Sequence, residues 1–200
     1  STSVLVVHPS VAVKNISELV ALAKARPGEL RYASAGSGSS PHLSAELFKT
    51  TAGINVVHVP YKGSTPGVVA TVSGETSLMF TGIASALAHI KAGRLRALSV
   101  NGPKRSSALP EVPTASESGL PGFEVDFWIG MLAPAGTPRA IVARLNSEVN
   151  RILGQDDVKE RLVALGTELV GGTSEQFAAV IKADVVKWAK AIKASGAKPE

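Results

Sequence analysis

Three short stretches rich in glycine and hydroxyl side chains could bind a small anion. Residues 34–40 read SAGSGSS, residues 61–65 read YKGST, and residues 81–82 read TG. Each follows an apolar run typical of a buried strand and precedes a helical pattern. Glycine lets a backbone approach a ligand, hydroxyls donate hydrogen bonds, and a helix N-terminus presents unpaired N–H groups. The three stretches therefore indicate an anion receptor, although the capped turns of any α/β protein have a similar composition.

The same stretches match no catalytic or phosphate-binding motif. Pro41 stands where a dinucleotide-binding loop needs its third glycine, and Lys62-Gly63-Ser64 has the wrong order for a P-loop. The first loop also lacks the Gly-x-Ser-x-Gly turn of a nucleophilic serine, and no paired carboxylates stand near it. We therefore expect no catalytic residue and no cofactor, and we keep an enzyme that uses Ser37 or His42 as an alternative of a different class.

The composition argues against a metal ion and against nucleic acid as ligands. The chain has 200 residues, no Cys and four His, and no two His have the spacing of a zinc site, so we expect no metal. Its net charge is +5, but the basic residues are dispersed and aromatic residues are few, which argues against nucleic acid. His8, His58 and His89 read as structural. His42 lies in the first turn after the Gly-Ser loop, where it either lines the site or caps the helix.

Strands and helices alternate through the first part of the chain. We predict strands at 4–8, 30–33, 54–59, 77–80 and 95–100, with helices between them, the first capped by Asn15. Ser40-Pro41 and Thr65-Pro66 each read as N-cap and first helical residue. This order predicts an α/β fold with a mostly parallel sheet flanked by helices.

The pattern changes after the last of these strands. Residues 101–121 are rich in Pro, Ser and Gly, residues 127–133 (FWIGMLA) look like a further strand, and the remainder reads as helices at 138–153, 156–165 and beyond Thr173. We place the domain boundary in this region, with a complete α/β ligand-binding lobe at 4–126 and a mainly helical portion of another lobe at 127–200.

Several segments in consistent order resemble the substrate-binding proteins of tripartite tricarboxylate transporters, the Bug family. They are RYASAGSGSSPHLSAELF, VVHVPYKGSTP, LMF, AHIKAGRLRALSV and LPEVPTASESGLPGFEVDFWIGMLAPAGTP, within residues 4–193. The resemblance implies a two-lobed periplasmic binding protein of type II that captures a small carboxylate and passes it to membrane transporter subunits. It also implies a periplasmic location, although no signal peptide is visible in this stretch.

The resemblance implies that main-chain amides and hydroxyls of the strand-to-helix loops hold the carboxylate. Carried over by position, the candidate ligand-binding residues are Ser34, Gly36, Ser37, Ser39, His42, Tyr61, Lys62, Gly63 and Thr81.

The sequence differs from the family pattern in two places, and each difference leads to an expectation. Family members commonly have Asp where this chain has Ser77 and Thr81, so we expect a plain carboxylate ligand rather than an amino acid. The usual first part of the first lobe, with its PFPPGG-type loop, has no counterpart here. We therefore expect self-association or poor order of residues 135–200, and we keep as an alternative a truncated remnant that binds weakly or not at all.

Overall fold

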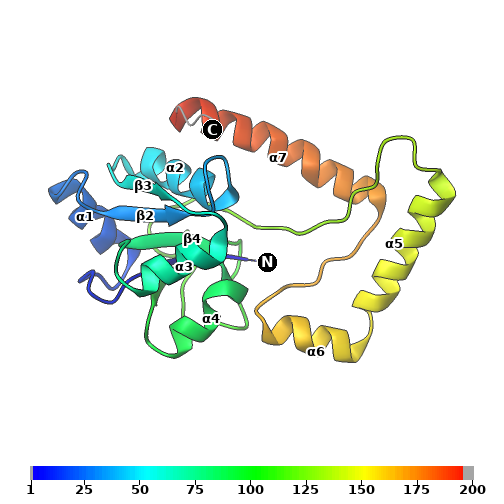
Figure 1. Ribbon diagram of the computed structural model, residues 1–200, viewed down its shortest axis with the longest axis horizontal. Coiled ribbons are helices and arrows are strands. Elements are labelled where there is room, and N and C mark those ends of the chain that lie inside the picture. Colours follow the sequence, from blue (N-terminus) through cyan, green and yellow to red (C-terminus); the bar gives the residue numbers. More distant parts are fainter. Residues whose placement is uncertain (1, 196–200) are drawn as a thin grey trace.

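The structure is a computed structural model that describes residues 2–195 (Figure 1). The elements in chain order are β1 (Ser3–Val7), α1 (Ile16–Ala25), β2 (Arg31–Ser34), α2 (Ser40–Ala52), β3 (Val57–Pro60), α3 (Ser64–Val72), β4 (Leu78–Gly82), α4 (Ile83–Lys91), β5 (Arg96–Val100), α5 (Arg139–Leu153), α6 (Asp156–Ala164) and α7 (Ser174–Ser195). Residues 196–200 of the second predicted portion lie outside the described residues.

The five strands form one sheet in the order β3-β2-β4-β1-β5. β2 pairs in parallel with β3 and with β4, whereas β1 is antiparallel to both of its neighbours, β4 and β5. The α/β fold with a helix-flanked sheet is therefore confirmed, but the sheet is mixed rather than mostly parallel, because β1 is reversed and both of its pairings are antiparallel. Because β1 runs the other way, α1 begins at the opposite edge of the sheet from α2, α3 and α4.

Hydrophobic clusters cover both faces of the sheet. One contains Leu5, Tyr32, Phe48 and Phe80, and the other contains Val6 and Met79 with residues of α3 and α4. The alternation of side chains along each strand sends successive residues to opposite faces, which is why Phe80 and its neighbour Met79 belong to different clusters. Helices on both faces thus bury the sheet and hold the ends of its strands in place (Figure 1).

Local signals in the sequence set several helix boundaries. The Asn15 side chain accepts a hydrogen bond of 2.8 Å from the Glu18 N–H, which caps α1 as predicted. Two starts differ from the prediction. The N-cap of α2 is Ser39 rather than Ser40, and the N-cap of α3 is Gly63 rather than Thr65. In both cases the helix begins earlier, so the proline lies inside the first turn.

The predicted strand at 127–133 is wrong. Only an isolated bridge between Thr2 and Asp126 marks the start of this segment, which continues as extended chain without ladder hydrogen bonds. Among the described residues no neighbouring strand is available to pair with it, so Ile129 is 92% exposed and Leu132 is 73% exposed.

The last three helices, α5, α6 and α7, differ in how they pack against the rest of the protein. α7 packs along α2, whereas α5 and α6 stand away from the sheet and bury none of their residues (Figure 1). Their apolar side chains, among them Ile141 and Leu145, face solvent. No described helix combines the length and the hydropathy that a membrane span requires.

Candidate functional site

The three predicted loops meet at one edge of the sheet. β2, β3 and β4 are neighbours that run in the same direction, so their carboxyl ends lie side by side. Each end leads into a helix, through residues 35–39 to α2, through 61–63 to α3, and directly from β4 to α4. Ligands of open α/β sheets bind at such an edge. The fold therefore brings all of the predicted site residues to one region.

Backbone hydrogen bonds join the first two loops. The Tyr61 N–H donates to the Ser34 carbonyl at 3.1 Å, and the Gly63 N–H donates to the Ala35 carbonyl at 3.3 Å. Gly36 has a φ of 117°, and a Cβ at this position would lie 3.4 Å from the Tyr61 carbonyl oxygen. The conformation thus favours glycine at position 36, and the added carbon would just touch the Tyr61 carbonyl oxygen.

Hydrogen bonds inside the first loop fix its shape. The Ser34 hydroxyl accepts from the Gly36 N–H at 3.1 Å, and the Ser39 hydroxyl donates to the Gly36 carbonyl at 2.6 Å. Ser34 is fully buried, whereas Ser37 and Ser39 are partly accessible. Ser34 and Gly36 therefore define the loop's conformation from within, and Ser37 lies at its partly exposed turn.

In the part of the chain that the structure describes, the three helix N-termini at this edge lack side-chain caps, although the Ile83 N–H of α4 donates to the Thr2 carbonyl at 3.1 Å. The N-cap residues of α2, α3 and α4 are Ser39, Gly63 and Gly82, and within the described residues none of them makes a side-chain capping bond. None of these helices has an acidic residue in its first turn, whereas α1, at the other edge, has both Asn15 as a cap and Glu18. α5 also lacks both features but stands away from the sheet. Uncapped amides and the positive ends of three helix dipoles thus converge at one edge.

Thr81, the next-to-last residue of β4, has an unusual hydroxyl near the same edge. The side chain is fully buried, and its Oγ1 has no hydrogen-bond partner among the described residues. A buried hydroxyl without a partner is costly, and such groups in native proteins commonly meet a ligand or water. Thr81 directly precedes Gly82, the N-cap of α4.

The residues of the second loop, 61–63, differ in their contacts. The Tyr61 hydroxyl donates to Glu75 at 2.8 Å, and burial together with this bond raises the pKa of Tyr61 to about 12. Its ring packs against the second hydrophobic cluster. Lys62 is exposed, and the Gly63 N–H is used between the loops. The Tyr61 side chain and the Gly63 N–H therefore stabilise the conformation of the second loop.

His42 and His58 lie together beneath the first loop. Their ring centroids are 4.1 Å apart and the planes are 6° from parallel. The sequence pattern predicts a structural His58 within a strand and gives no contact between His58 and His42. The parallel register places His58 opposite Tyr32, two residue pairs before the carboxyl ends of the strands, and this pairing is the signal that could have linked the two histidines.

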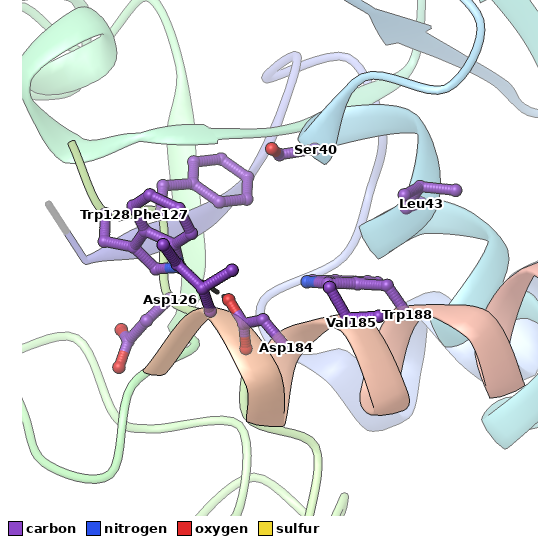
Figure 2. A pocket seen from close by; sticks show the side chains of 9 residues that line it. Ser40, Leu43, Asp126, Phe127, Trp128, Asp184, Val185 and Trp188 are labelled. Carbon is purple, nitrogen blue, oxygen red and sulfur yellow. Dashed lines mark hydrogen bonds between the residues drawn. The ribbon is translucent and has the colours of Figure 1, made fainter. Parts of the chain in front are cut away.

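A separate pocket of about 410 Å³ lies between α2, the segment that starts at Asp126, and α7 (Figure 2). Its wall is mainly apolar and includes Trp128 and Trp188, and the Trp128 Nε1–H donates to Asp184 at 2.5 Å. Desolvation raises the pKa of Asp126. Asp126 and Asp184 in the wall disfavour an anion, so we interpret this pocket as the packing interface between α7 and α2 rather than as the anion site.

The described part of the chain contains no cluster of three or more His, Cys, Asp or Glu that could hold a metal.

A family model described as "Tripartite tricarboxylate transporter family receptor" matches residues 1–197. The chain is 44% identical over 191 residues to the "UPF0065 protein in tcbD-tcbE intergenic region" of Pseudomonas sp. (strain P51), which covers 95% of the chain and 57% of that relative. The solved structure "R. palustris Rpa4515 with adipate" is 36% identical with a TM-score of 0.93 and matches 100% of this chain and 67% of its own. The "periplasmic binding protein BugD" is 30% identical with a TM-score of 0.90 and matches 100% of this chain and 67% of its own. The chain thus spans little more than half the length of the curated relative.

Proposed function

Because the chain belongs to the receptor family of the tripartite tricarboxylate transporters, we propose that it binds a small carboxylate at the edge formed by the β2–α2, β3–α3 and β4–α4 junctions. The family is one of solute-binding receptors. Here the ligand would be held by helix N-terminal amides and hydroxyls and released unchanged, without catalysis and without a cofactor.

One observation carries the proposal. Three helices begin side by side at the same edge, with neither a capping side chain nor an acidic first turn within the described residues. Each such terminus favours an anion by about 0.3–1 kcal/mol at an exposed site. The carboxylate would take its hydrogen bonds from first-turn amides and from the hydroxyls of Ser37, Ser39 and Thr81. Ser34, Gly36, Tyr61 and Gly63 would act by shaping the two loops.

We further propose that the ligand is a plain carboxylate without an amino group. Ser77 lies before β4, at the far edge of the sheet, where its hydroxyl accepts the Arg31 N–H at 3.1 Å. Of these two positions, only Thr81 lies at the proposed site. Its neutral hydroxyl lacks the negative charge with which an Asp would pair with an ammonium group. Adipate, a carboxylate without an amino group, is the ligand named for one solved neighbour.

The wider role follows from the family. We propose that residues 4–126 form the ligand-binding lobe, and that residues 127–200 belong to a second lobe. We also propose that the protein acts outside the cytoplasmic membrane, as the neighbour described as a periplasmic binding protein does, and that its partners are the membrane subunits of a tripartite transporter.

A thermal-shift screen against mono-, di- and tricarboxylates tests the proposal, followed by mass analysis of each mixture. A ligand at 100 times its dissociation constant stabilises the folded state by about 2.7 kcal/mol. A shift without chemical change supports the receptor. Conversion of the carboxylate would support an enzyme instead, and the absence of any shift would support a remnant that does not bind. Tighter binding of aspartate or glutamate than of every plain carboxylate would contradict the ligand class.

A pair of glycine variants locates the site. Gly36→Ala places a side chain where φ is 117° and the Tyr61 carbonyl is close, so the loop must move and affinity should fall at least tenfold. Gly53→Ala is the control, because Gly53 also has a positive φ of 61° but ends α2 at the other edge, with nothing within 4 Å of the added carbon. It should lower stability by about 1–2 kcal/mol and leave affinity unchanged.

A further inference from the structure

Two imidazoles and a phenol form a stack behind the first loop. The His42 and His58 ring centroids are 4.1 Å apart, and Tyr32 lies 4.8 Å from His58 on β3. His42 is only 6% exposed. The stack is therefore packed between α2 and the sheet, and His42 has little surface to offer a ligand.

Each histidine holds one end of the loop. The Gly38 N–H donates to His42 Nδ1 at 2.9 Å. A backbone N–H can only donate, so Nδ1 carries no proton and the ring is neutral with its proton on Nε2. His58 Nε2 lies 2.6 Å from the Ser34 hydroxyl, which in turn accepts the Gly36 N–H. The two rings thus fix Gly36 and Gly38, the residues on either side of the exposed turn.

The charged groups around the stack are already paired. Glu46 lies one turn after His42 on α2, where it accepts from the Tyr32 hydroxyl at 2.6 Å and from Lys49 at 2.7 Å. On α7, which packs against α2, Asp184 accepts from Trp128, and Lys187 donates to the Glu124 carbonyl. Lys62 of the neighbouring loop is exposed. Glu46, Asp184 and Lys187 thus each have another partner in the structure.

We propose that His42 and His58 are positioning residues that hold the anion-binding loop, and that protonation of His42 loosens the loop and weakens ligand binding. A proton on Nδ1 replaces the acceptor of the Gly38 N–H with a second donor, so this hydrogen bond must break. A second positive charge on the stacked ring 4.1 Å away would be repelled, so the pair takes at most one proton readily. This inference rests on the proposed function of the loop.

The direction of the pH effect separates this role from direct ligand contact. A histidine that touched the carboxylate would bind it more tightly once protonated, whereas a positioning histidine binds it less tightly. Affinity should therefore fall as the pH is lowered from 7.5 to 5.5, in proportion to the fraction of His42 that becomes protonated.

Isothermal calorimetry with adipate across this pH range tests the inference in the wild type and three variants. His42→Asn keeps an acceptor near the Nδ1 position but cannot titrate, so its pH dependence should be flat apart from that of the ligand. His58→Gln keeps a polar group near Ser34 and should retain the wild-type direction. His8→Asn is the matched control, because His8 Nδ1 also accepts a backbone N–H, from Ser10, at the opposite edge of the sheet. It should leave the profile unchanged.

Nuclear magnetic resonance gives a readout that needs no ligand. The Gly38 amide resonance should follow an imidazole titration in the wild type and stay constant in His42→Asn. The inference is overturned if affinity rises on acidification, if His42→Asn keeps the wild-type profile, or if the Gly38 amide does not respond between pH 8 and pH 5. If adipate binds at no pH, the proposed function fails for that ligand, and the Gly38 titration still decides whether His42 holds the loop.

Discussion

Replacing Thr81 by Val should stabilise the unliganded protein and weaken ligand binding. The Thr81 side chain is fully buried and its hydroxyl has no partner among the described residues. A buried, unsatisfied hydroxyl costs about 1–3 kcal/mol, and Val has almost the same shape without the polar group. The free energy of unfolding should therefore rise by about 1 kcal/mol or more, measured by urea denaturation without ligand.

Affinity should change in the opposite direction. If the Thr81 hydroxyl donates to the bound carboxylate, the variant loses a hydrogen bond to a charged group, which contributes about 1.5–3 kcal/mol. That loss corresponds to a dissociation constant about 10 to 150 times larger, which calorimetry with the best carboxylate from the screen would detect.

Thr71→Val supplies the matched control. Thr71 is as deeply buried, but its hydroxyl donates to the Gly67 carbonyl at 2.9 Å and lies 2.9 Å from the Thr76 hydroxyl. The same substitution there breaks satisfied hydrogen bonds and should destabilise the fold without a specific effect on affinity. If Thr81→Val destabilises the unliganded protein as much as Thr71→Val does, or leaves affinity unchanged, the assignment of Thr81 to the ligand is refuted.

Three other measurements address the core, the second loop and the exposed segment. Phe48→Ala should cost about 3–5 kcal/mol in urea denaturation, because Phe48 is fully buried in edge contact with two other Phe rings; a loss below about 1 kcal/mol would contradict this packing. In a spectrophotometric titration Tyr61 should ionise near pH 12. Because the pKa of Tyr61 is raised in the folded state, its contribution to the free energy of unfolding is present below pH 10 and is lost as pH rises from 10 to 12. Glu75→Gln should lower this pKa only part of the way to 10, because burial is the largest cause of the shift. A return to 10 in the variant would contradict burial as the largest cause. Light scattering should show self-association that Ile129→Asp reduces, because Ile129 is 92% exposed; a wild type that stays at 20.6 kDa at all concentrations would argue against it.

Local sequence signals were sufficient where neighbouring residues decide the structure. Asn15 and Glu18 cap α1 as predicted, and the Thr173 hydroxyl accepts the Gln176 N–H at 3.2 Å in the predicted capping box of α7. The Gly-Ser loop is a strand-to-helix junction as expected, because its two flanks carry their own strand and helix patterns. These features depend on contacts within a few residues, so the chain itself specifies them.

Other features depend on which segments become neighbours. The apolar pattern of residues 127–133 is typical of a strand, but a strand needs a partner, and none pairs with it among the described residues. The reversed direction of β1 is likewise a matter of sheet order, since a short apolar run has the same pattern in either direction.

The anion-binding edge shows both contributions. The sequence by itself determined which residue types stand at the strand ends, and their family resemblance indicated a carboxylate. Only the tertiary structure placed Tyr61 against Ser34, left the Thr81 hydroxyl without a partner among the described residues, and stacked His42 on His58. The physical reason is that hydrogen bonds and ring contacts between residues far apart in sequence exist only once the sheet has ordered its strands.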